Sequence, residues 1–166
     1  RKTLAEQRQD EIAAEKQSAT IAVAVDNAEV LKYPEGVVED YMAQQIDYVR
    51  YYATMYGMSY EDFVSAALGM DTAAYEAEVR KSAEQSVKEE LVVWAIAEAE
   101  NFTISEERRA EELKSLLAYY DYEDLASMCE AYGFSEDYMN RTMTYSIYYV
   151  DVMDMLVENA TFTGAK

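Results

Sequence analysis

The sequence contains no histidine, one cysteine and one proline in 166 residues. The absence of histidine removes the commonest general base, and it excludes the Glu-x-x-His pairs that hold iron in helical bundles. Cys129 has no second cysteine for an internal disulfide and no histidine that could activate it as a nucleophile. We therefore expect a buried, inert Cys129, and we predict no catalytic residue, no metal and no cofactor.

Basic residues are also scarce, because 14 Lys and Arg face 33 Asp and Glu and leave a net charge of −19. Nucleic-acid binding begins with Lys and Arg that neutralise phosphates, and anionic membrane surfaces attract the same residues. The composition therefore predicts neither partner. The sequence contains no run of about 18 apolar residues, which is the length needed to cross a membrane. Together with the unpaired cysteine, these features predict a protein of the reducing cytoplasm.

Strand-like alternation is rare, so the predicted fold class is all-α, with about seven helices. Pro34 is expected to begin the second helix, because proline suits the first helical position. The longest helices exceed what a compact domain of this size needs, so we expect one elongated domain over residues 1–166. Residues 162–166 are expected to form a disordered tail. The predicted helices span 3–27, 34–56, 60–68, 72–100, 105–119, a short segment that ends at Gly133, and 136–160.

A four-residue unit occurs three times, as "YGMS" at 56–59, "LGMD" at 68–71 and "YGFS" at 132–135. Each glycine can end a helix in the left-handed conformation, and the next residue can fold back onto the last turn. The Ser or Asp that follows can accept hydrogen bonds from the free N–H groups of the next helix. We interpret each unit as a helix end joined directly to a helix start.

Sixteen tyrosines and nine methionines are the abundant feature, and they concentrate on the second and last helices. Each of these helices carries two apolar stripes, although a surface helix needs only one. Tyrosine tolerates partial wetting and methionine adapts to varied partners, so the Tyr-rich stripes are the candidates for an open surface. The predicted binding residues are Tyr41, Tyr48, Tyr52, Met55, Tyr145, Tyr149 and Met153. The aliphatic stripes, which include Val38, Ala53, Met143, Ile147 and Val150, are assigned to the core.

Two further features receive structural interpretations. Asp151, Asp154 and Glu158 lie about one helical turn apart and could hold a hard cation, but a solvated acidic face explains them better. Trp94 is expected to anchor the packing of the longest helix.

Over residues 3–162 the chain resembles the C-terminal, substrate-cradling domain of trigger factor, the bacterial ribosome-associated chaperone. The resemblance is carried by "RKTLAEQRQDEIAAEKQ", "YPEGVVEDYMAQQIDYV", "YGMSYEDF", "LGMDTAAYEAEVRKSAEQSVKEELVVWAIAEAENFTISEE" and "DMLVENATF". The family's ribosome-binding loop and its FKBP-like prolyl isomerase domain have no counterpart in these residues. The resemblance therefore implies ribosome docking and isomerase activity only for a longer parent chain.

The resemblance implies a trigger factor or SurA-like peptide-binding fold, in which long helices form arms around a shallow concavity. It also implies an ATP-independent chaperone of protein folding and transport, which binds unfolded or nascent polypeptides and is not itself an enzyme. The alternative is a structural helical module whose second stripes pack in a homodimer and bind no client. Both hypotheses use the same Tyr and Met residues.

Overall fold

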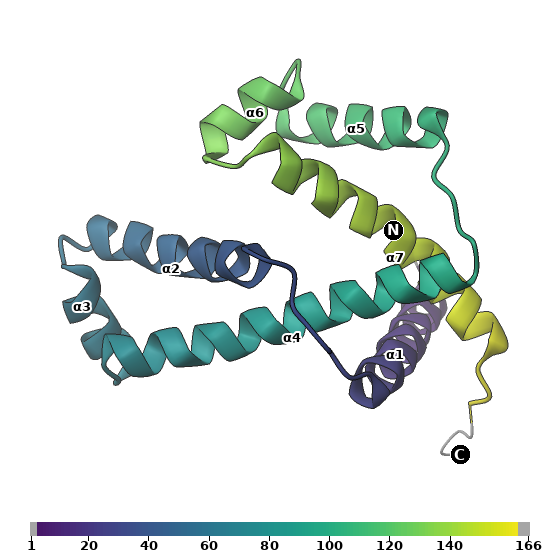
Figure 1. Cartoon of the computed structure of the whole chain (residues 1–166), viewed down its shortest axis with the longest axis horizontal. Coiled ribbons are helices and arrows are strands. Elements are labelled where there is room, and N and C mark those ends of the chain that lie inside the picture. The colour runs from purple at the N-terminus through teal and green to yellow at the C-terminus, as the bar shows by residue number, and fades with distance from the viewer. Residues whose placement is uncertain (1–2, 163–166) are drawn as a thin grey trace. The chain divides into compact units, whose positions relative to one another are not determined.

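The computed structural model describes residues 3–162, in which seven α-helices and one π-helical turn occur and no strand is found (Figure 1). The all-α prediction is confirmed, and every predicted helix is present. In chain order the elements are α1 (Leu4–Asn27), α2 (Val37–Met55), α3 (Tyr60–Phe63), the π-turn η1 (Val64–Leu68), α4 (Thr72–Ala99), α5 (Glu106–Tyr120), α6 (Leu125–Tyr132) and α7 (Glu136–Asn159).

The repeated four-residue units join helices as their sequence predicts. Gly57 has a φ of 66°, and the N–H of Met58 donates to the carbonyl of Ala53 at 2.9 Å. Ser59 then caps α3, because its side-chain oxygen accepts a hydrogen bond from the N–H of Asp62 at 3.0 Å. The other two units have the same left-handed glycine and the same type of side-chain cap. Each unit is therefore a complete joint in four residues.

Two further joints have the same left-handed residue at the helix end but no glycine. A search of the sequence for glycine therefore does not find them. Asn101 and Asp121 both adopt a φ of 59° after α4 and α5. Phe102 donates its N–H to the carbonyl of Ala97 at 2.8 Å, which repeats the closing bond made at Met58. Asn and Asp tolerate the left-handed region better than other residues with a side chain.

The prediction for Pro34 is wrong, because α2 begins at Val37. Gly36 stands at the N-cap in the left-handed conformation, with a φ of 78° and no side-chain cap. This conformation separates the proline from the helix, so Pro34 belongs to the preceding connector.

The chain divides into two compact units, with the boundary inside α4. The α2 unit covers residues 29–91, and its main core joins α2 to α4 through Val37, Val38, Ala83 and Val87. The partly buried Tyr33, Tyr41, Met42 and Leu91 pack against this core. The predictions of a single domain and of arms around a concavity stay predictions.

The α7 unit covers the described residues of 1–28 and 92–166. Its main core joins α1, the last turns of α4 and α7, which lie together in Figure 1, through Ile21, Val25, Val92, Val93, Ala97, Val152 and Met153. Trp94 is half-buried, and its ring meets Tyr148 edge-on at 5.3 Å between centroids, in line with its predicted packing role. Of the predicted tail only Phe162 is described, and the remaining residues lie outside the described part.

α5 is held to α7 by an ion pair with two hydrogen bonds. The guanidinium of Arg108 donates to both carboxylate oxygens of Asp151, at 2.7 and 2.9 Å. Bonding to this carboxylate raises the pKa of Arg108. Asp151 therefore has a structural partner, which agrees with leaving the acidic triplet out of the candidate sites.

Candidate functional site

An exposed aromatic surface lies on the last two turns of α2. Tyr48 is 63% exposed and Met55 is 64% exposed, and Tyr52 lies half-buried between them. Tyr51 and Tyr56 are also exposed, although they were not among the predicted residues. We call this surface the α2 patch, and define it as Tyr48, Tyr51, Tyr52, Met55 and Tyr56.

The helical period places the α2 patch on one face. Positions 48, 51, 52 and 55 are separated by three, four and seven residues, which brings their side chains to the same side of a helix. Ala53 points away from this side and is buried. The spacing from Tyr48 to Tyr51 was therefore the signal that could have added Tyr51 to the prediction.

The rings of the α2 patch contact one another. Tyr48 and Tyr52 meet edge-on at 4.8 Å between centroids, and their hydroxyls are hydrogen-bonded at 3.1 Å. This hydrogen bond raises the pKa of the Tyr52 hydroxyl. Tyr51 meets Tyr52 edge-on at 5.7 Å between centroids, and Tyr56 stacks on Phe63 of α3 at 5.9 Å. The rings are thus ordered by contacts within the chain while the surface stays open to solvent.

Tyr41 lies apart from the α2 patch, at the contact between α2 and α4. Its hydroxyl donates to Oε2 of Glu90 at 3.0 Å, and Glu90 is only 5% exposed. The Tyr41 ring packs against the core of the α2 unit. Its hydroxyl therefore supplies a hydrogen bond to a buried carboxylate, which would be costly to leave without one.

The predicted residues of α7 pack toward the core. Tyr145 and Tyr149 are half-buried against it, with their rings 5.7 Å apart. Met153 is 2% exposed and is a member of the core itself. Val150, which was assigned to the core, is instead 52% exposed. On α7, therefore, the aliphatic stripe is not wholly buried and the Tyr-rich stripe is not wholly exposed to solvent. Met153 is left out of the proposed surface.

A second group of aromatic side chains surrounds the joints of α5, α6 and α7. Tyr119 is 80% exposed, and Tyr120 and Tyr132 are also exposed. The ring of Tyr132 lies 5.7 Å from that of Tyr120 and 6.2 Å from that of Phe134, on which it stacks. We call this the α5–α6 cluster, with Tyr119, Tyr120, Tyr122, Tyr132, Phe134 and Tyr138 as members. In the sequence this cluster is indicated by the segment "YYDY" at 119–122, which lies at a helix end.

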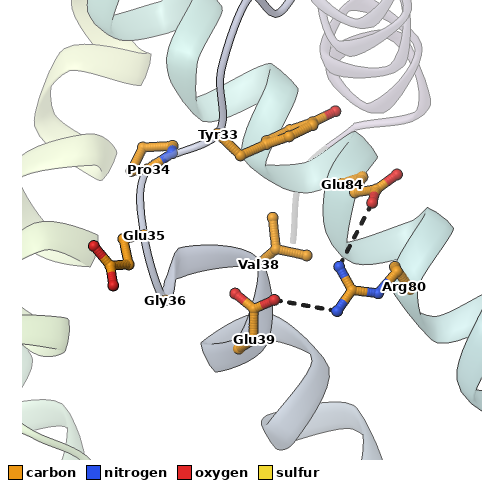
Figure 2. Close-up of a pocket in the computed structure, with 8 residues that line it drawn as sticks. All are labelled: Tyr33, Pro34, Glu35, Gly36, Val38, Glu39, Arg80 and Glu84. Atoms are coloured by element: carbon orange, nitrogen blue, oxygen red, sulfur yellow. Dashed lines mark hydrogen bonds and ion pairs between the residues drawn. The ribbon is translucent and has the colours of Figure 1, made fainter.

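A pocket of about 490 Å³ lies where the chain enters α2, and Figure 2 shows its side chains. Arg80 of α4 lies between Glu39 at 3.1 Å and Glu84 at 3.8 Å. A backbone N–H group and this guanidinium lower the pKa of Glu39. Glu35 points away from these ion pairs (Figure 2). Arg80 already has two carboxylate partners. We therefore interpret the side chains of this pocket as structural contacts that hold α2 against α4.

Cys129 is buried in α6, as predicted, and burial raises the pKa of its thiol. A buried thiol with a raised pKa is a poor nucleophile. Within the described residues no three Cys, Asp or Glu side chains are grouped so as to hold a metal ion. None of the helices described here combines the length and apolarity needed to cross a membrane.

The comparison with known proteins identifies the family. Residues 1–158 match the family model described as the C-terminus of the bacterial trigger factor protein. Trigger factor of Listeria innocua is 35% identical over 122 residues, which are 74% of this chain and 28% of the relative. Trigger factor of Pediococcus pentosaceus is 29% identical over 153 residues, which are 91% of this chain and 34% of the relative. No solved structure matches the chain.

The chain thus spans about a third or less of the length of these relatives. The matched region is the family's C-terminal part and not its isomerase domain, so the prediction that this segment is not an enzyme is confirmed. The helices, their joints and the matched residues lead to one assignment: the chain belongs to the trigger factor family and corresponds to its C-terminal region.

Proposed function

We propose that this chain is an ATP-independent chaperone segment that binds unfolded or nascent polypeptides, chiefly through the α2 patch. The observation that carries the proposal is the set of ordered, solvent-exposed rings on one face of α2. In this proposal the segment acts in the cytoplasm, and ribosome binding and prolyl isomerisation belong to other domains of a longer chain.

Burial of the exposed rings of the α2 patch by a client lowers the free energy of the complex. Burying one exposed Tyr or Met side chain contributes about 1–2 kcal/mol, so several weak contacts are needed for useful affinity. The Tyr48 and Tyr51 rings already rest against Tyr52, which reduces the entropy lost when a client covers them. Such a surface favours apolar segments of many sequences over one defined ligand.

The charge of the chain supports a client over a second copy as the partner. A net charge of −19 keeps an apolar surface soluble, and it also makes two copies repel each other. The homodimer of the alternative hypothesis would have to overcome this repulsion. An unfolded client of lower or opposite charge would not.

The test uses a triple variant with Tyr48→Ser, Tyr51→Ser and Met55→Ser. All three side chains are exposed, so the fold should remain intact. We expect affinity for a labelled, permanently unfolded client to fall at least fivefold, because the loss of even one contact worth on the order of 1 kcal/mol corresponds to about that factor. Fluorescence anisotropy measures the affinity, and light scattering of an aggregating client measures the protection.

The matched control replaces Leu31 and Val150, two exposed apolar side chains outside the α2 patch, with Ser. This control should bind the client as the unchanged chain does. A triple variant with full affinity would contradict the proposal, as would an unchanged chain that suppresses no aggregation at several-fold molar excess. A tight dimer in sedimentation, with no dye-accessible apolar surface, would support the assembly module instead.

A further inference from the structure

A pocket of about 540 Å³ lies within the α7 unit, at the joint where α4 ends. A volume of this size falls inside the range for small-molecule sites. We call it the Trp94 pocket, and its lining residues are Trp94, Ala95, Ala97, Glu98, Asn101, Phe102, Thr103 and Tyr148. Three of these eight residues are aromatic, and they come from α4, the joint and α7.

The aromatic residues of this pocket are held by contacts within the chain. The ring planes of Trp94 and Tyr148 are inclined at 71°, with 5.3 Å between their centroids. The Tyr148 hydroxyl donates to the carbonyl of Phe102 at 3.5 Å, and the N–H of Phe102 donates to the carbonyl of Ala97 at 2.8 Å. These bonds tie α7 to the joint and the joint to α4. The aromatic walls are therefore ordered without a ligand, which reduces the entropy lost on binding.

The electrostatics of the pocket favour a positive charge. Of the charged residues in the described part of the chain, only Glu98 lines it. Glu98 follows Trp94 by four residues, so the two side chains are neighbours on one face of α4. The pocket also lies at the C-terminal end of α4, where the helix dipole is negative. Aromatic faces attract cations through the ring quadrupole, so the rings, the carboxylate and the helix end all select the same charge.

We propose that the Trp94 pocket binds a small, free organic cation that carries a quaternary ammonium group. The methyl groups of such a cation pack against aromatic rings, and its charge needs no hydrogen-bond acceptor from the protein. A primary ammonium is strongly hydrated and would lose more hydration in the same place. This inference goes beyond the proposed function and does not rest on it, because the α2 patch belongs to the other unit.

The experiment uses choline as the probe and the fluorescence of Trp94 as the signal. Trp94 is the only tryptophan in the sequence, so its emission reports on this pocket alone. The reference probe is the neutral analogue of choline, in which a tert-butyl group replaces the trimethylammonium group. We expect a saturable change with choline and an affinity about fivefold or more above that of the neutral analogue. Sodium chloride at matched ionic strength should give no saturable change.

A pair of variants tests the role of the carboxylate. Glu98→Gln should weaken choline binding about threefold, as expected for an exposed charge pair, and leave binding of the neutral analogue unchanged. The matched control is Glu100→Gln, which changes the net charge equally at an exposed residue that does not line the pocket. This control should bind choline as the unchanged chain does. Circular dichroism should show the same helix content in all three chains.

Three results would overturn the inference. They are no saturable change with choline, equal affinity for choline and its neutral analogue, and equal losses in the Glu98 and Glu100 variants. The last result would assign the attraction to the net charge of the chain. Phosphatidylcholine vesicles give a further arm, because a response to vesicles without a response to free choline would assign the site to a lipid headgroup and contradict the proposal.

Discussion

α2 and α7 both carry tyrosine and methionine at helical spacing, but the environments of these side chains differ. Met55 on α2 is 64% exposed, whereas Met153 on α7 is 2% exposed. α7 contacts α1, α5 and α6, and its core residues also meet the end of α4. The last turns of α2 contact α3, and the rings of the α2 patch stay on the open side. Helical spacing therefore determines which side chains share a face, and the neighbouring helices determine whether that face is exposed to solvent.

The largest expected effect is a difference in the free energy of unfolding between variants of the two methionines, Met153 and Met55. Met153→Ala should lower the free energy of unfolding by about 2–4 kcal/mol, because it leaves a cavity in the core of the α7 unit. Met55→Ala should change it by about 0.5 kcal/mol or less, because the side chain is exposed. Urea unfolding followed by circular dichroism measures both. Equal losses in the two variants would show that the two stripes have the same environment.

A second prediction separates stability from binding at the tyrosines. Tyr149→Ser should destabilise the chain by about 1–2 kcal/mol, since a half-buried ring loses its core contacts. Tyr48→Ser should leave the melting temperature almost unchanged and weaken client binding instead. Differential scanning fluorimetry and anisotropy, applied to both variants, give the two quantities. The comparison fails if Tyr149→Ser melts like the unchanged chain and weakens client binding as much as Tyr48→Ser does.

The smallest expected effect concerns the N-terminus of one helix in each unit, α6 in the α7 unit and α2 in the α2 unit. Asp124 caps α6 and accepts hydrogen bonds from the N–H and hydroxyl of Ser127, which lower the pKa of its carboxyl group. A lowered folded-state pKa means that this stabilisation is present above the unfolded value near pH 4 and is lost as pH falls through the folded value. The start of α2 has no side-chain cap at Gly36 and lacks this source of acid sensitivity.

Asp124→Asn keeps an acceptor at the cap and removes the titration. The amide signal of Ser127 should therefore shift with acid in the unchanged chain and stay constant in the variant. A shift of the same size in both chains would assign the acid response to other carboxylates. Amide NMR spectra recorded between pH 6 and 2 measure it.

Features set by local chemistry were predictable from the sequence. Gly57 and Ser59 form a joint because a left-handed residue and a side-chain cap need only a few neighbours. Pro34 was misplaced because the left-handed Gly36 after it overrides its preference for the first helical position. Asn101 and Asp121 close helices in the same way as glycine, but such residues also occur in many other settings.

Features set by packing between distant segments were not predictable in the same way. Whether Tyr145 or Val150 is covered depends on which sides of α7 meet its neighbours, and a helical period does not contain that information. Tyr51 shares a face with Tyr48 and was within reach of the periodicity. The exposure of Tyr119 and Tyr132 depends on the α5–α6 joint, which brings these helix ends together without covering them.

The central claim is that clients bind the α2 patch while the tyrosines of α7 support the core. Its most direct test is site-specific photocrosslinking, with p-benzoylphenylalanine placed at position 48, 51 or 149 and a labelled unfolded client in solution. The account predicts strong client adducts from positions 48 and 51 and few from position 149, which is half-buried in the α7 unit. Strong adducts from position 149, with few from positions 48 and 51, would contradict it.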